Sequence, residues 1–459
     1  MPLLDFPPDM YRLRPNEAPY YGTFPDLKKC VQWFVSLLPK DEWSARRDTV
    51  AKRFYQCLVG EFDDETGRGR YFDDRDMFGW YLFLGEAFTD HPWNYELMFG
   101  CRVIPILGAI GRNLDVLQGV QGFVERARSI TSTERSQPNS GLFEILVAAA
   151  YARAGWRVRF KPVEKGIART YDLDAKKGRR RIAIECKRME GGEYHEQERN
   201  RMRELWKVPS IGLVKGEERS TYLEVRFKIE LMDVPDNYLL HRVYDFLNSK
   251  MPSLLWNDDV ASGVIGDLDL TPIQDYLKES YLLHPSPTFN NLITGSYRRY
   301  DSLIEASRIR HAVNPHFIEE LDLAVMARWS SDSEAAIEKK ARDIQAKLVE
   351  ANRQLPHDIP GVVHIGFEAL AGDDVEQRRY EKIIDRARRF ARGNSRLEFI
   401  YCHYFAPEST SEEPWAIDET FQWIGIRKNN RPLEKAMLLL PDGDSPSRLG
   451  VHWDGKGVA

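Results

Sequence analysis

Residues 171–188 read YDLDAKKGRRRIAIECKR, and the prediction of the fold starts from this segment. Both halves alternate apolar and polar residues, which predicts two β-strands. Between them Gly178 supplies the positive φ that a tight turn needs, so we expect an antiparallel hairpin closed on Gly178-Arg179. Lys177 then pairs with Arg180.

Extending this register outward sorts the side chains of the hairpin onto two faces. The apolar face holds Leu173, Ala175, Ile182, Ile184 and Cys186. The other face holds Asp172, Asp174, Ala183, Glu185 and Lys187. A slip of one residue would mix the two sets, so the pattern itself supports the register.

This register places the carboxylates of Asp172 and Glu185 opposite each other. Two like charges at 4 Å repel by about 1 kcal/mol in water and about 4 kcal/mol at an effective dielectric near 20. A divalent cation removes that penalty, and Mg²⁺ commonly uses one or two carboxylates with waters and phosphates. Lys187 projects from the same face, where it could orient or deprotonate a metal-bound water or stabilise charge on a phosphate.

A further carboxylate precedes the hairpin. Glu144 lies in the segment GLFEILVAAAYA, which predicts an apolar helix. A glutamate in such a helix is expected either to reach a polar site or to be an exposed first-turn residue near a cap at Ser140.

The order of a helical Glu, a strand Asp and a Glu-x-Lys strand resembles the PD-(D/E)XK nuclease superfamily. The matching residues are Glu144, Asp172 and Glu185-Cys186-Lys187, while Tyr171 replaces the proline that often precedes the Asp. The resemblance covers residues 140–210 approximately. We expect residues 335–406 to supply the rest of the same core, with a helix followed by a buried strand.

The resemblance implies an α/β fold, with a restriction-endonuclease-like α/β/α core around a mixed sheet. It also implies Mg²⁺-dependent phosphodiester hydrolysis, with Mn²⁺ as the alternative ion. Asp172 and Glu185 would bind the metal, Lys187 would assist the water, and Glu144 would be an accessory ligand or base. Asp174 is the alternative to Asp172, or a residue that supports it.

Outside the hairpin, the sequence divides into four parts. We expect a helical N-terminal domain (1–130), a first part of the core (131–234), an insertion or accessory region (235–334), and the rest of the core with the C-terminal region (335–459). Asp41 is expected to cap a helix, and 334–355 to form one helix. Residues 361–370 and 397–406 read as buried strands, and the tail after Pro407 as irregular.

Basic residues gather in two places. Lys176, Lys177, Arg179 and Arg180 lie at the hairpin tip, where they could engage phosphates or only solubilise the turn. The helix expected over 375–391 is also basic and would either line a nucleic-acid channel or form a charged outer face. Near its start, the helix after the hairpin carries His195 and Arg199, which contact substrate or pair with other charges.

Composition limits the class of protein. With 459 residues, 65 basic against 70 acidic side chains and a net charge of −5, the chain is no polycation, so nucleic-acid binding must be local. The five scattered cysteines exclude a disulfide scaffold and a zinc ribbon. No apolar window is long enough to span a membrane and the N-terminus lacks signal-peptide features, so we expect a cytoplasmic protein without a membrane partner.

The expected function is therefore that of a metal-dependent endonuclease that binds nucleic acid, DNA rather than RNA. Bacterial antiviral defence is an expectation by analogy, and a homodimer or an activating partner protein stays open. The alternative is a catalytically silent nuclease-fold module that binds nucleic acid or serves as a scaffold. A third interpretation, a helical interaction protein with a solvated Glu-x-Lys strand, predicts no metal between the strands.

Overall fold

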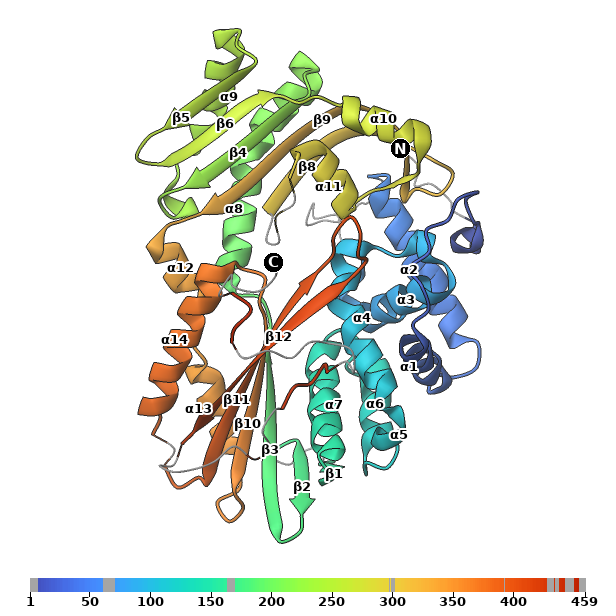
Figure 1. Ribbon diagram of the computed structural model, residues 1–459, viewed down its shortest axis with the longest axis vertical. Helices are drawn as coiled ribbons and strands as arrows, with labels where there is room; N and C mark the ends of the chain where they lie inside the picture. The colour runs from blue at the N-terminus through green and yellow to red at the C-terminus, as the bar shows by residue number, and fades with distance from the viewer. Residues whose placement is uncertain are drawn as a thin grey trace.

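Two mixed β-sheets with flanking helices form the chain, which confirms the expected α/β class (Figure 1). The computed structural model describes residues 7–60, 71–162, 170–296, 298, 302–391, 393–426, 433, 437–441 and 450–453. In that part of the chain no helix is long and apolar enough to cross a membrane.

The first sheet contains the predicted hairpin. Its strands, in spatial order, are β1 (Arg157–Phe160), β2 (Leu173–Lys177), β3 (Arg180–Met189), β10 (Gly361–Glu368), β11 (Leu397–Glu408) and β12 (Ala416–Gly425). The central strands β3, β10 and β11 run parallel to one another, and the other neighbours are antiparallel. Strand β12 lies where the sequence predicted an irregular tail.

The predicted register of the hairpin is confirmed. Lys177 pairs with Arg180 and Leu173 with Ile184, and Gly178 has a φ of 61°. The apolar face, including Cys186, packs into a core shared with α7 (Pro138–Arg153). The alternation of apolar and polar residues, together with Gly178 in the turn, was therefore enough to predict the register of this hairpin.

Helices cover both faces of the first sheet. The N-terminal helices join α7 on one face: α1 (Pro25–Ser36), α2 (Glu42–Leu58), α3 (Met77–Asp90), α4 (Leu97–Arg112), α5 (Leu114–Leu117) and α6 (Phe123–Thr131). Helices α13 (Gln345–Gln354) and α14 (Asp373–Arg389) cover the opposite face, as Figure 1 shows. The candidate catalytic strand β3 thus lies between two helical layers.

The second sheet lies above the first in Figure 1. Its strands are β4 (Thr221–Phe227), β5 (Ser253–Asn257), β6 (Ala261–Asp267), β7 (Leu282–Leu283), β8 (Ser302–His311) and β9 (Phe317–Ser331). Its helices are α8 (Glu193–Ile211), α9 (Tyr238–Ser249), α10 (Thr271–Glu279) and α11 (Pro287–Thr294), while α12 (Glu334–Lys340) packs against α14 and α8. Because β4 pairs with β6 and β9, the second sheet begins before the expected border at 234.

Two local expectations were wrong. The segment 334–355 breaks into α12 and α13, because Ala341 leaves the helical conformation (ψ 61°). In the turn that follows, the carboxylate of Asp343 accepts the N–H of Gln345 (2.8 Å). Asp41 precedes α2 in a left-handed conformation (φ 64°), and its side chain makes no capping bond.

Candidate metal and nuclease site

Asp172 is held against β3 by two hydrogen bonds. Its N–H donates to the carbonyl of Ile184, which continues the hairpin ladder one step beyond β2. Its Oδ2 accepts the N–H of Cys186 at 2.8 Å. The carboxylate therefore lies close enough to Glu185 for repulsion between the two groups to raise the pKa of Asp172.

Glu185 is 1% exposed, although it is a carboxylate. Its Oε1 accepts from Lys187 Nζ at 2.8 Å. Its Oε2 is fully buried, and no donor among the described residues reaches it. An ionised Glu185 thus has one oxygen without compensation, which is costly in a buried site.

Lys187 lies next to Glu185, and its ammonium group makes three contacts. Besides Glu185, its Nζ donates to Glu350 Oε1 and Gln354 Oε1 of α13, each at 2.8 Å. Burial tends to lower the pKa of Lys187, but Glu185 and Glu350 outweigh it and raise that pKa. The side chain is therefore a cation in this arrangement.

The α13 residues were missed by the sequence interpretation. Glu350 and Gln354 are four residues apart on α13, so they project from one face of that helix. The sequence shows that this face is polar. It does not show that the face meets Lys187, because β3 lies more than 160 positions earlier in the chain.

Glu144 is buried (6% exposed) in α7, so the interpretation as an exposed first-turn residue was wrong. Both carboxylate oxygens accept from the guanidinium of Arg126 on α6, at 2.7 and 2.9 Å. Arg126 also donates to Glu134 at 2.7 Å. No local sequence pattern indicates this bidentate pair, which leaves Glu144 occupied unless Arg126 moves.

The pKa values of the three carboxyl groups are all raised. Burial is the largest cause for each, and it raises the pKa of Glu144 to about 8 and those of Asp172 and Glu185 to about 7. Repulsion by Asp172 adds to the shift at Glu144, and repulsion by Glu185 adds to that at Asp172. Negative charge is therefore crowded at this end of the hairpin.

Asp174 belongs to a different set of contacts. It accepts from Arg159 (2.7 Å), Tyr171 (2.9 Å) and Arg181 (3.0 Å). Burial tends to raise its pKa, but these donors outweigh burial and lower it. With two arginines on its oxygens, Asp174 is a poor alternative to Asp172 as a metal ligand.

The donor set at Asp172 and Glu185 fits a hard divalent cation. Both groups are oxygen donors, their charges repel, and Oε2 of Glu185 is buried without a partner. Within the described ranges no group of three or more His, Cys, Asp or Glu side chains could hold a metal. An ion here would therefore take two carboxylates and complete its coordination with waters or substrate oxygens.

The basic hairpin tip is exposed. Lys176, Arg179 and Arg180 lie on its surface, and Lys177 lies 5.9 Å from the ring centroid of Trp156. Arg180 is five residues from Glu185 along β3, which is about 17 Å at the rise of a strand. The tip is therefore near the site but not part of it.

The basic helix α14 is largely neutralised. Its cations pair with carboxylates, mainly of α12 and the turn before α13: Arg378 and Lys382 with Glu338, Arg386 with Asp343, Arg379 with Glu376, and Arg389 with Asp385. This favours a charged outer face over a nucleic-acid channel.

Comparisons with protein-family models, curated proteins and solved structures gave no match to the chain.

Proposed function

We propose that the chain is a metal-dependent nuclease that hydrolyses phosphodiester bonds, in DNA rather than RNA, as an endonuclease. The observation that carries this proposal is the juxtaposition of Asp172, Glu185 and Lys187 at one end of the hairpin, with a buried carboxylate oxygen that no donor satisfies. Such a set has no evident structural use, because it places like charges together in a buried environment.

The arrangement of elements supports the same proposal. Helix α7 precedes the hairpin and packs on it, and β10 and β11 extend the sheet in parallel beyond β3. Helices α13 and α14 cover the other face. This agrees with the α/β/α core that the PD-(D/E)XK resemblance implies.

Asp172 and Glu185 would hold Mg²⁺, or Mn²⁺, which would activate a water for attack and neutralise charge on the phosphate. Lys187, kept protonated by Glu185 and Glu350, supplies a positive charge next to the reacting phosphate. Of the roles considered for Lys187, charge stabilisation agrees with its protonation better than proton abstraction does.

The test is a cleavage assay on supercoiled plasmid, linear duplex, single-stranded DNA and RNA, with Mg²⁺, Mn²⁺ or EDTA. We expect nicking of DNA that EDTA abolishes and that Asp172→Asn or Lys187→Ala lowers at least 100-fold. Asp174→Asn is the matched control, because it removes a charge two residues along the same strand and should retain most activity. Cleavage that survives both site substitutions would rule out the assigned site.

The second candidate, a catalytically silent module that binds nucleic acid, is favoured by one observation. Both Glu144 and Lys187 are engaged by other side chains, Arg126 and Glu350 among them. This candidate predicts DNA binding without cleavage in any metal, and binding that Asp172→Asn does not weaken.

A further inference from the structure

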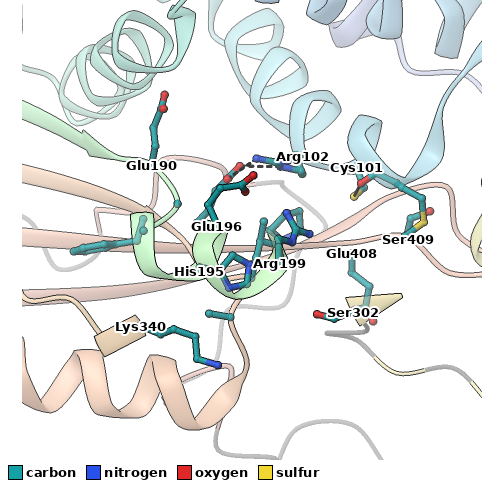
Figure 2. A pocket seen from close by; sticks show the side chains of 18 of the residues that line it. Cys101, Arg102, Glu190, His195, Glu196, Arg199, Ser302, Lys340, Glu408 and Ser409 are labelled. Atoms are coloured by element: carbon teal, nitrogen blue, oxygen red, sulfur yellow. Dashed lines mark hydrogen bonds and ion pairs between the residues drawn. The ribbon is translucent and has the colours of Figure 1, made fainter. Parts of the chain in front are cut away.

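A cavity of about 540 Å³ lies outside the candidate metal site. Its walls include the segments that follow the parallel strands β3, β10 and β11, and on the other side residues of α11 and the start of β8 (Figure 2). The crevice beyond the carboxyl ends of parallel strands is the usual place for ligands in open α/β sheets. The volume is that of a site for a small organic molecule.

One end of this cavity is positively charged. Figure 2 shows His195 and Arg199 on the first turns of α8, with Lys340 across from them. The pKa of His195 is lowered to about 4, mainly because the side chain is buried. Three nearby cations add to this shift: Arg199, Lys340 and Arg379. The imidazole is therefore neutral, and its buried Nδ1 has no hydrogen-bond partner among the described residues.

Some of the cations in the lining are neutralised and others are not. Arg102 pairs with Glu368 at 2.6 Å, and Lys340 with Glu198 at 3.2 Å. For Arg199 and Arg342, by contrast, the described part of the chain offers no carboxylate within 4 Å; Arg342 donates only to the carbonyl of Glu190. Two guanidinium groups of the lining, those of Arg199 and Arg342, thus make no salt bridge with the described residues, and guanidinium suits phosphate in particular.

The remaining lining is suited to an organic group. Leu370, which is 37% exposed, supplies apolar surface next to the largely covered Met189 and Phe367. Asn290, Ser296 and Ser302 supply hydrogen-bonding groups. A planar base or another ring can lie on such apolar side chains while its edge meets amides and hydroxyls.

Carboxylates in the lining limit the charge of the ligand. Glu196 and Glu408 are part of the wall, and burial raises the pKa of Glu408. A long polyanion would meet these groups as well as the arginines. Burial lowers the pKa of Arg199, and the nearby charge of Glu196 opposes that shift. A ligand with a single phosphate therefore meets less repulsion here than a polyanion would.

From this cavity we infer a binding site for a mononucleotide-sized organic phosphate, with the phosphate at Arg199, Arg342 and His195 and the organic group against Leu370 and Asn290. The site is separate from Asp172, Glu185 and Lys187. It does not depend on the proposed nuclease activity.

The test is isothermal titration of the full chain with ribonucleoside monophosphates and triphosphates, and with adenosine as the probe that lacks phosphate. We expect at least one nucleotide to bind and adenosine to bind at least tenfold more weakly than its phosphate. Arg199→Ala and Arg342→Ala should each raise the Kd at least tenfold. The exposed Arg203→Ala, one turn further along α8, should change the Kd less than twofold, and thermal melting should show that each variant is folded.

Two variants of the candidate metal site, Lys187→Ala and Asp172→Asn, separate this inference from the proposed nuclease activity. Both should bind the nucleotide as the wild-type chain does, whether or not the chain cleaves DNA. The inference is overturned if no nucleotide binds, if adenosine binds as tightly as AMP, or if Lys187→Ala weakens binding as much as Arg199→Ala.

Discussion

At the scale of single residues, the buried carboxyl groups of Glu144, Asp172 and Glu185 determine how the site responds to pH. Their pKa values in the folded chain, about 7 to 8, lie above the value near 4 of an unfolded chain. Between about pH 4 and pH 8 the folded state therefore holds more protons than the unfolded state. The stability that these groups contribute is complete below about pH 4 and is lost as pH rises through 7 to 8.

This leads to a prediction about Mg²⁺. At pH 8 in EDTA, Asp172→Asn should melt a few kelvin above the wild-type chain, because it removes one of the crowded charges. Addition of 10 mM Mg²⁺ should raise the melting temperature of the wild type and leave Asp172→Asn nearly unchanged. Asp174→Asn controls for general salt effects, and an equal Mg²⁺ response in all three proteins would contradict a metal at Asp172.

The bidentate pair between Arg126 and Glu144 gives a second prediction. Loss of one partner leaves the other buried and uncompensated, so Arg126→Ala should lower the free energy of unfolding by about 3–5 kcal/mol in urea denaturation. The double variant Arg126→Ala, Glu144→Leu should recover at least half of that loss. If the double variant is as unstable as the single one, the pair does not account for the effect.

At the scale of elements, a buried chain of hydrogen bonds crosses three neighbouring strands. Tyr151 of α7 bonds to Nε2 of His364 in β10 at 3.0 Å, and Nδ1 of His364 bonds to Nε2 of His403 in β11 at 3.0 Å. Nδ1 of His403 reaches Glu419 of β12 at 2.9 Å. Burial, then His403, lowers the pKa of His364 well below its usual value, so His364 is neutral in the folded chain.

Acid should therefore weaken this sheet. Since His364 gains its proton more readily in the unfolded chain, its contribution to stability is present above about pH 6.5 and is lost as pH falls below that value. We predict that His364→Ala lowers the free energy of unfolding by about 2–3 kcal/mol at pH 7.5 and by clearly less at pH 5. The exposed His357→Ala is the control, and an equal loss at both pH values would contradict the assigned titration.

The two sheets show which contacts can be predicted from the sequence and which cannot. The hairpin register followed from 18 consecutive residues, because its pattern is local. The partners Arg126 and Glu350 did not, because each meets its site only when distant elements pack together. The same holds for β4, whose seven residues read as a strand without indicating that β6 and β9 pair with it.

At the scale of the whole molecule, charge is sorted between the two ends of the hairpin. Negative charge is held at Asp172 and Glu185, and positive charge lies at the exposed tip about 17 Å away, five residues along β3. A duplex rises about 3.4 Å per base pair, so a strand cleaved at the site would bring a phosphate to the tip about five base pairs from the cut. The tip would then add affinity without touching the reacting bond.

The salt dependence of DNA binding measures that contribution. Replacement of Lys176, Arg179 and Arg180 by alanine should reduce the slope of log K against log[salt] by about 3, since each phosphate contact contributes about 0.9. The matched control replaces Arg203, Lys207 and Lys215, which are exposed on α8 and in the π-helical turn that follows it (Gly212–Glu217), and should leave the slope unchanged. Duplexes with fewer than about five base pairs on the tip side should bind the wild type and the tip variant alike. If the tip variant keeps the wild-type slope on long duplexes, the tip is only a solubilising turn, and the DNA must follow another surface.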